Sequence, residues 1–115
     1  MAVLAVFFSG CATMEQHKPP LAGNWKNNLG TVWMIHADGT FDVDLNHDGK
    51  RDAWGTYAVA GNVVTIQETG DMAKVCKGKG VYRFDREDTM LHFKLVSDDC
   101  KLRKKNVQMT WHAIK

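Results

Sequence analysis

The stretch TVWMIHADGTFDVDL, residues 31–45, decides the fold because its hydrophobic residues alternate on both sides of a turn. Successive side chains of a β-strand point to opposite faces of the sheet, so residues i and i+2 share a face. With a turn at residues 37–39, the facing pairs are Ile35 with Phe41 and Trp33 with Val43. The stretch therefore predicts an antiparallel hairpin with one hydrophobic face and one polar face.

Two further pairs of segments show the same alternation. With a turn at Ala60-Gly61, the predicted facing pairs are Tyr57 with Val64 and Gly55 with Ile66. Near the C-terminus the predicted pairs are Leu91 with Ala113, Phe93 with Trp111 and Leu95 with Met109. A sheet with one hydrophobic face must curl over that face to exclude water, and closure into a barrel also removes its exposed edges.

We therefore predict an all-β domain, an antiparallel up-and-down meander of about eight strands that closes into a small barrel. The expected strands cover residues 23–27, 31–36, 40–45, 53–59, 62–68, 80–85, 89–96 and 106–114. No segment shows sustained helical periodicity. The basic residues Lys101, Arg103, Lys104 and Lys105 are expected to form a charged hairpin loop.

Size and charge limit the classes of function. At 115 residues, with 44% hydrophobic content, the chain has room for one domain with a real core. Its 15 Lys and Arg against 13 Asp and Glu give a formal charge of +2. This is too near balance for the dense positive field that nucleic-acid binding requires, so we expect no nucleic-acid partner.

The N-terminal segment resembles the export signal of a bacterial lipoprotein. Residues 1–10 carry no charged side chain and contain a hydrophobic run that is too short to span a bilayer. The sequence FSGC, which ends at Cys11, resembles the lipobox, although Phe8 stands where that family usually has Leu. The resemblance implies lipidation of Cys11. Because residues 12–20 are polar, contain both prolines and lack periodicity, we expect a flexible tether over residues 11–20 and a folded domain over residues 21–115. The alternative is an N-terminal strand or helix with a buried free cysteine.

Cys76 and Cys100 remain as a pair once Cys11 is assigned to the anchor. Because an exported chain reaches an oxidising compartment, we expect them to form a disulfide. Zinc binding is the weaker alternative, since no further cysteine and no suitably spaced histidine accompanies either residue.

The stretch DLNHDGKRD, residues 44–52, resembles the start of an EF-hand or dockerin calcium loop. It places oxygen-bearing side chains at alternate positions and follows them with a glycine, a pattern that can direct several oxygens at one Ca²⁺. The expected ligands are Asp44, Asn46, Asp48, the carbonyl of Lys50, and Asp52. The twelfth position of the loop, which usually holds a bidentate Glu, is Gly55. The alternative is a solvated hairpin loop, because Asn, Asp and Gly favour turns. No other cofactor is expected.

Gly23-Asn24-Trp25 resembles the Gly-x-Trp signature of the lipocalins and related calycins, and the expected meander has their strand order. The stretches DGTF, residues 38–41, and GTY, residues 55–57, also resemble hairpins of small bacterial lipocalin-like lipoproteins. The resemblance covers residues 21–115. It implies that Trp25 closes one end of the barrel against a basic residue near the last strand, for which Arg103 and Lys104 are the candidates.

Aromatic and aliphatic side chains on the inward face are the expected lining of a ligand pocket. They are Trp33, Ile35, Phe41, Tyr57, Ile66, Phe93 and Trp111. In the alternative interpretation the same side chains simply fill the core. The chain has no Gly-x-Ser-x-Gly elbow, phosphate loop or His-Glu-x-x-His helix, so we expect no enzyme.

Together these features favour an outer-membrane lipoprotein that faces the periplasm and binds a small hydrophobic or amphipathic ligand without transforming it. The membrane would be its partner through the lipid anchor. The alternative is a protein-binding periplasmic inhibitor, or an envelope assembly or structural factor, that acts through its loops. A cavity of a few hundred Å³ would favour the ligand, and a filled core with a protruding loop would favour the protein partner.

Overall fold

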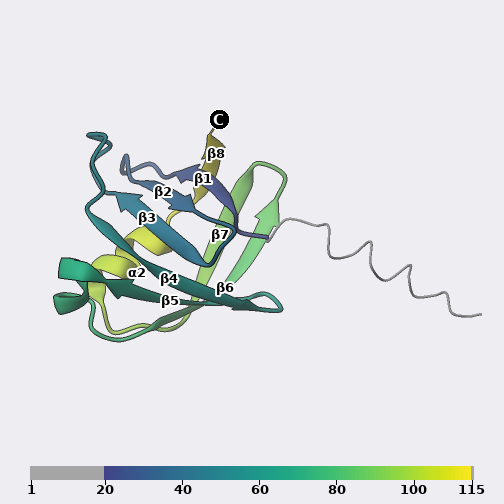
Figure 1. Cartoon of the computed structure of the whole chain (residues 1–115). Coiled ribbons are helices and arrows are strands. Elements are labelled where there is room, and N and C mark those ends of the chain that lie inside the picture. The colour runs from purple at the N-terminus through teal and green to yellow at the C-terminus, as the bar shows by residue number, and fades with distance from the viewer. Residues whose placement is uncertain (1–19, 115) are drawn as a thin grey trace, which may run out of the picture.

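In the computed structural model, which describes residues 20–114, eight strands follow one another in chain order around a closed barrel. The strands are β1 (Gly23–Lys26), β2 (Val32–Ile35), β3 (Thr40–Asp44), β4 (Ala53–Ala60), β5 (Val63–Thr69), β6 (Gly80–Glu87), β7 (Met90–Ser97) and β8 (Trp111–Ile114). Each pairs antiparallel with its neighbours, and β8 closes the barrel against β1 (Figure 1). The predicted all-β meander is confirmed.

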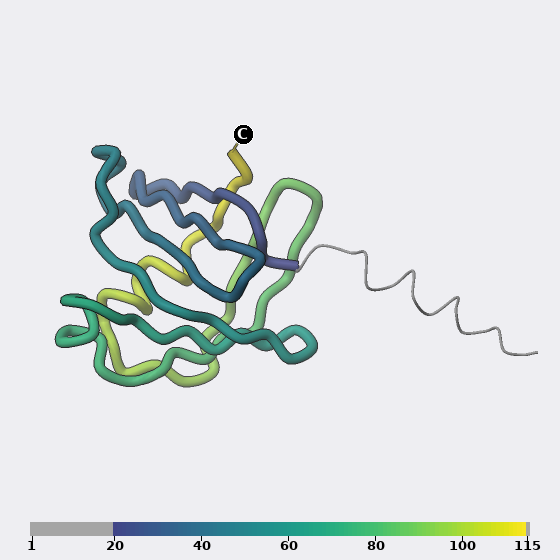
Figure 2. The backbone as a smooth tube through the Cα atoms, viewed as in Figure 1, coloured from purple at the N-terminus to yellow at the C-terminus, as the bar shows by residue number. Residues whose placement is uncertain are grey.

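Two short helices lie at one end of the barrel. The 3-10 helix η3 (Gly70–Lys74) follows β5, and α2 (Lys101–Val107) precedes β8. We call this the helix-capped end. At the opposite, N-terminal end, the chain enters β1 beside the turns that join β4 to β5 and β6 to β7 (Figure 2). No helix within residues 20–114 is long and apolar enough to cross a membrane.

The β2–β3 hairpin has the predicted register, with Trp33 opposite Val43 and Ile35 opposite Phe41. The β4–β5 hairpin differs from its prediction by two residues, because Tyr57 faces Ile66. Its two-residue turn begins at Gly61, which adopts a positive φ of 62°, so the strands reverse later than expected. A shift of two residues leaves each side chain on its predicted face.

The pairing predicted for β7 and β8 is wrong in register. Leu91 faces Trp111 instead of Ala113. Leu95, which was expected to point inward, is 38% exposed, and it lies beside a β-bulge between Val81 and Tyr82 that alters the pairing of β6 with β7.

The predicted charged hairpin loop at residues 101–105 is also wrong, because these residues form α2. Arg103 and Val107 lie four residues apart, on one face of the helix, and both are buried. The helix has only seven residues and one of its two inward positions is charged. A hydrophobic pattern could not reveal it.

The barrel interior is filled by aromatic and aliphatic side chains. The ring of Trp33 lies at its centre, with centroids 5.2 Å from Trp111, 5.4 Å from Phe93 and 6.0 Å from Phe41. Leu21, Trp25, Ile35, Val64, Ile66, Tyr82, Leu91 and Val107 complete the buried cluster. Burial of this apolar surface is the main force that holds the sheet closed.

Candidate functional site

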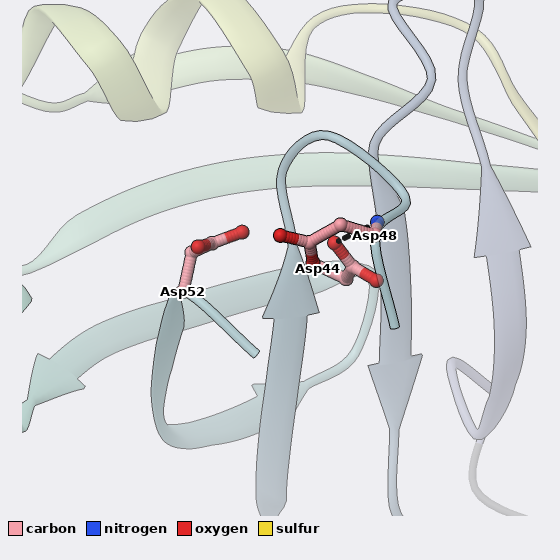
Figure 3. A group of neighbouring side chains, drawn as sticks. All are labelled: Asp44, Asp48 and Asp52. Atoms are coloured by element: carbon pink, nitrogen blue, oxygen red, sulfur yellow. Dashed lines mark hydrogen bonds between the residues drawn. The ribbon is translucent and has the colours of Figure 1, made fainter. Parts of the chain in front are cut away.

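Three carboxylates of the β3–β4 loop converge at the helix-capped end. Asp44 is the last residue of β3, Asp52 immediately precedes β4, and Asp48 lies on the exposed part of the loop between them. One carboxylate oxygen from each lies within 4.8 Å of the other two (Figure 3). The sequence prediction that these side chains gather at one point agrees with this geometry.

Hydrogen bonds from the backbone give the loop its shape. The carboxylate of Asp44 accepts from the N–H groups of Asp48 at 3.1 Å and Gly49 at 2.8 Å. The carboxylate of Asp52 accepts from the N–H of Leu45 at 2.8 Å. Gly49 has a φ of 89°, which glycine adopts at little cost. The loop is therefore organised by its own carboxylates.

Asp44 is 5% exposed, and its ionisation reflects two opposing influences. Burial raises the pKa of its carboxyl group, whereas the backbone hydrogen bonds from Gly49 and Asp48 lower it. The net pKa lies below its ordinary value. Asp44 thus presents a negative charge at neutral pH, as a carboxylate that binds a cation must.

The amide of Asn46 completes the cluster. The end of the amide that faces Asp44 and Asp48 lies 3.2 Å from their carboxylate oxygens, and it donates hydrogen bonds to them only when the amide is turned so that this end is the nitrogen. In the opposite orientation the amide oxygen faces the same point and adds a fourth oxygen-bearing side chain. Lys50, whose carbonyl is the fifth expected ligand, is exposed in the loop.

Position twelve of the loop cannot hold the usual glutamate in this fold. Gly55 is buried in β4, and a Cβ atom there would overlap the backbone carbonyl of Gln67 in β5. Any cation at this loop must therefore be held by the ligands at residues 44–52 and by water, which limits its affinity.

A second feature of this end is a cavity of about 50 Å³ between the barrel interior and α2. Four of the seven predicted pocket residues line it: Trp33, Phe41, Ile66 and Trp111. Leu102 and Val107 of α2 also line it. Pockets for drug-sized molecules usually measure about 300–1,000 Å³, so this cavity has room for only a few atoms.

The other three predicted pocket residues lie away from this lining. Ile35 and Phe93 are packed in the core. Tyr57 is half-buried near the N-terminal end, where its hydroxyl donates a hydrogen bond of 2.6 Å to the carbonyl of His36.

A charged cluster, formed by Arg103, Glu68, Asp98 and the hydroxyl of Tyr82, is buried beside the cavity. Arg103 donates to Asp98 through Nε and Nη2, both at 2.7 Å, and to Glu68 through Nη1. It also donates to the carbonyl of Gly78 at 2.9 Å. The Tyr82 hydroxyl donates to Asp98 at 2.5 Å. The cluster ties α2 to β5, β6 and the segment after β7.

The two carboxylates of this cluster titrate differently. Burial raises the pKa of Asp98, but the hydrogen bonds from Arg103, Tyr82 and the N–H of Cys100 outweigh it, so the net pKa is lowered. Burial dominates at Glu68 and raises its pKa despite the favourable charge of Arg103. Burial and the hydrogen bond to Asp98 raise the pKa of Tyr82.

Arg103 is not the cation that packs on Trp25. The guanidinium carbon of Arg86, from β6, lies 5.0 Å from the Trp25 ring centroid. The Trp25 Nε1–H donates to the carbonyl of Leu21 at 3.0 Å. Trp25 is buried at the N-terminal end as the resemblance implied, but Arg103 occupies the opposite end of the barrel and pairs with acids.

Cys76 and Cys100 form the predicted disulfide, with their Cα atoms 5.1 Å apart. Cys76 closely follows η3, and Cys100 is the residue that precedes α2. The disulfide thus links the two helices that cap the barrel. Cys11, the predicted lipidation site, lies outside the described residues.

Sequence reasoning missed the inward role of Glu68, Tyr82 and Asp98. One signal was available for Glu68, because it continues the alternation of the inward residues Val64 and Ile66. A charged residue at such a position requires a buried partner. The partner lies in a helix that the sequence did not predict.

The sequence matches no protein-family model, and no curated protein is significantly similar to it. The resemblance to lipocalins therefore stays a prediction from the Gly23-Asn24-Trp25 signature and the strand order.

Proposed function

We propose that this chain is a non-catalytic, lipid-anchored domain of the bacterial envelope that binds Ca²⁺ through the loop at residues 44–52. The observation that supports the proposal is the convergence of the carboxylates of Asp44, Asp48 and Asp52 within 4.8 Å, together with the nearby amide of Asn46. Ca²⁺ prefers oxygen ligands and needs six to eight of them. Water would supply those that the loop does not.

The expected affinity is low. Without a bidentate Glu at the twelfth position, the site has one fewer charged ligand than a sensor loop, and we expect a dissociation constant of about 10⁻⁴–10⁻³ M, as in extracellular modules. Such an affinity suits a compartment where Ca²⁺ is abundant. Binding to the folded state alone would raise the melting temperature with Ca²⁺ concentration.

Calorimetric titration of the folded chain with CaCl₂ tests this proposal, with MgCl₂ at equal ionic strength as the comparison. Asp48→Asn should abolish Ca²⁺ binding, because it removes a charged ligand from the exposed part of the loop. Asp85→Asn, at an exposed acid of β6, is the matched control and should bind normally. A melting temperature that does not change with millimolar CaCl₂ contradicts the proposal.

A second candidate function is binding of a small amphipathic molecule beneath α2. The supporting observation is the cavity whose walls are Trp33, Phe41, Ile66 and Trp111, with Glu68 and Arg103 also in its lining. At about 50 Å³, the cavity admits only a small molecule or the end of a larger one, unless α2 moves. Native mass spectrometry of protein purified from the envelope would detect a retained ligand. Detection of a stoichiometric protein partner instead would favour an envelope assembly or inhibitor role.

The proposed location in the envelope has its own test, which does not depend on the barrel. Cys11→Ala should abolish incorporation of radiolabelled palmitate and release the protein from the membrane fraction in a bacterial host. Equal labelling of the parent chain and the variant would contradict the lipoprotein proposal and would leave the calcium proposal intact.

A further inference from the structure

The indole N–H of Trp33 has no hydrogen-bond partner. Trp33 is 4% exposed and lines the cavity beneath α2. Within residues 20–114, Trp33 Nε1 and Asn27 Nδ2 are the two buried side-chain atoms that lack a partner, and Asn27 does not line that cavity. A buried N–H without an acceptor is unfavourable because it has lost its hydrogen bonds to water without replacing them, so it marks a place where an acceptor is favoured.

The indole N–H groups of two other tryptophans do have hydrogen-bond acceptors. Trp25 Nε1 donates to the carbonyl of Leu21, and Trp111 Nε1 donates to the carbonyl of Val107, both at 3.0 Å. The N–H groups of Trp25 and Trp111 therefore have acceptors within the chain. The Trp33 N–H has no acceptor among the described residues, and the Trp33 side chain lines the cavity.

The charges around the same cavity restrict what can accept from Trp33. Arg103 is one cation held between two carboxylates, those of Glu68 and Asp98, and four of its five N–H groups already donate to protein oxygens. Little donor capacity remains for an anionic ligand. A carboxylate or phosphate would also be repelled by Glu68, which lines the cavity.

We propose that the cavity beneath α2 binds the hydroxyl end of a small neutral molecule, which accepts a hydrogen bond from Trp33 Nε1 and donates one to the carboxylate of Glu68. A hydroxyl group both donates and accepts. A carboxylate only accepts, and an ammonium group only donates. The inference rests on the second candidate function and names the class of ligand for that cavity.

Titration of ¹⁵N-labelled protein with three matched probes tests the inference: 1-propanol, propionate and propylammonium. The reporter is the Trp33 indole N–H cross-peak, which is assigned by its loss in Trp33→Phe. The cross-peaks of Trp25 and Trp111 serve as internal references because their N–H groups are already bonded. We expect a saturable shift of the Trp33 peak with 1-propanol and an affinity at least about tenfold weaker for the other two probes.

Glu68→Gln tests the role of the negative charge by removing it. The variant keeps the size of the side chain, removes the repulsion between the Glu68 carboxylate and an anionic probe, and offers an amide donor. Propionate should therefore shift the Trp33 peak in this variant. Dispersed amide spectra are the check that this variant folds. If it does not fold, the order of the three probes on the parent chain still decides the matter.

Each outcome has a distinct meaning. A Trp33 peak that responds to propionate but not to 1-propanol overturns the hydroxyl assignment and leaves small-molecule binding standing. If no probe gives a saturable shift of the Trp33 peak, and the Trp33 N–H exchanges only with water, both the inference and the second candidate function are overturned. Neither result bears on the Ca²⁺ proposal.

Discussion

Arg103 in α2 and Glu68 in β5 are paired inside the helix-capped end of the barrel, although 35 residues separate them in the chain. Their side chains are 4% and 7% exposed. A buried ion pair is well tolerated only while both partners are present, because the loss of one leaves a charge without compensation in a medium of low dielectric constant. The position of α2 therefore depends on this pair as well as on hydrophobic packing.

Arg103→Met should destabilise the fold strongly. The variant keeps much of the hydrophobic volume of the side chain but leaves Glu68 and Asp98 buried without their cation. Breaking a buried pair in this way costs about 3–5 kcal/mol, which urea unfolding followed by tryptophan fluorescence would measure. Arg83→Met, at an exposed position of β6, is the control and should change stability little. Equal stability of the two variants would contradict the role assigned to Arg103.

Asp98→Asn should weaken the fold in a pH-dependent manner. The pKa of Asp98 is lowered from its ordinary value of 3.8, so its contribution to stability is present above the unfolded pKa and is lost as the pH falls through the folded pKa. Glu68, whose pKa is raised, acts with the opposite sign, because its contribution is lost as the pH rises through its folded pKa.

The measurement is the difference in melting temperature between the parent chain and Asp98→Asn from pH 7 to about pH 2. It should be largest at neutral pH and should shrink once Asp98 protonates in the parent chain. A difference of constant size across this range would show that charge at Asp98 is not the cause.

The hairpins were predictable because their information is local. Between residues 31 and 45 the alternation of hydrophobic side chains and the turn residues specify one face and one register. The β4–β5 turn was misplaced because Ala60-Gly61 and Gly61-Asn62 are both plausible turn pairs, and only the second places Gly61 at the first turn position. The gathering of carboxylates in the β3–β4 loop was equally predictable, since the residues that carry them lie close together in the chain.

The charged cluster was not predictable in the same way. Arg103 looks like a member of a basic surface run, and only its contact with Glu68 and Asp98 distinguishes it from Lys101 and Lys105, which are exposed. Such contacts arise between elements that are distant in sequence. No periodicity within one segment can show them.

Gly55→Ala should destabilise the barrel because β4 and β5 approach closely at this point. A Cβ atom at Gly55 would overlap the carbonyl of Gln67, and such overpacking costs about 1–3 kcal/mol. The matched control is Gly78→Ala, where a Cβ atom would meet no atom within 4 Å. Chemical denaturation of both variants checks the prediction, and it fails if Gly55→Ala is no less stable than Gly78→Ala.

The disulfide should stabilise the helix-capped end more than the rest of the barrel. Cys76 and Cys100 close a segment of 24 residues in sequence separation, and removal of such a link costs about 2–4 kcal/mol, largely through the unfolded chain. Because Cys100 directly precedes α2, the double variant Cys76→Ala/Cys100→Ala should also free the start of this helix. Amide hydrogen exchange should then increase first in residues 101–107 and η3, while β2 and β3 remain protected. Uniform acceleration over all strands would show instead that the disulfide acts on global stability alone, and that Arg103 is sufficient to hold α2 in place.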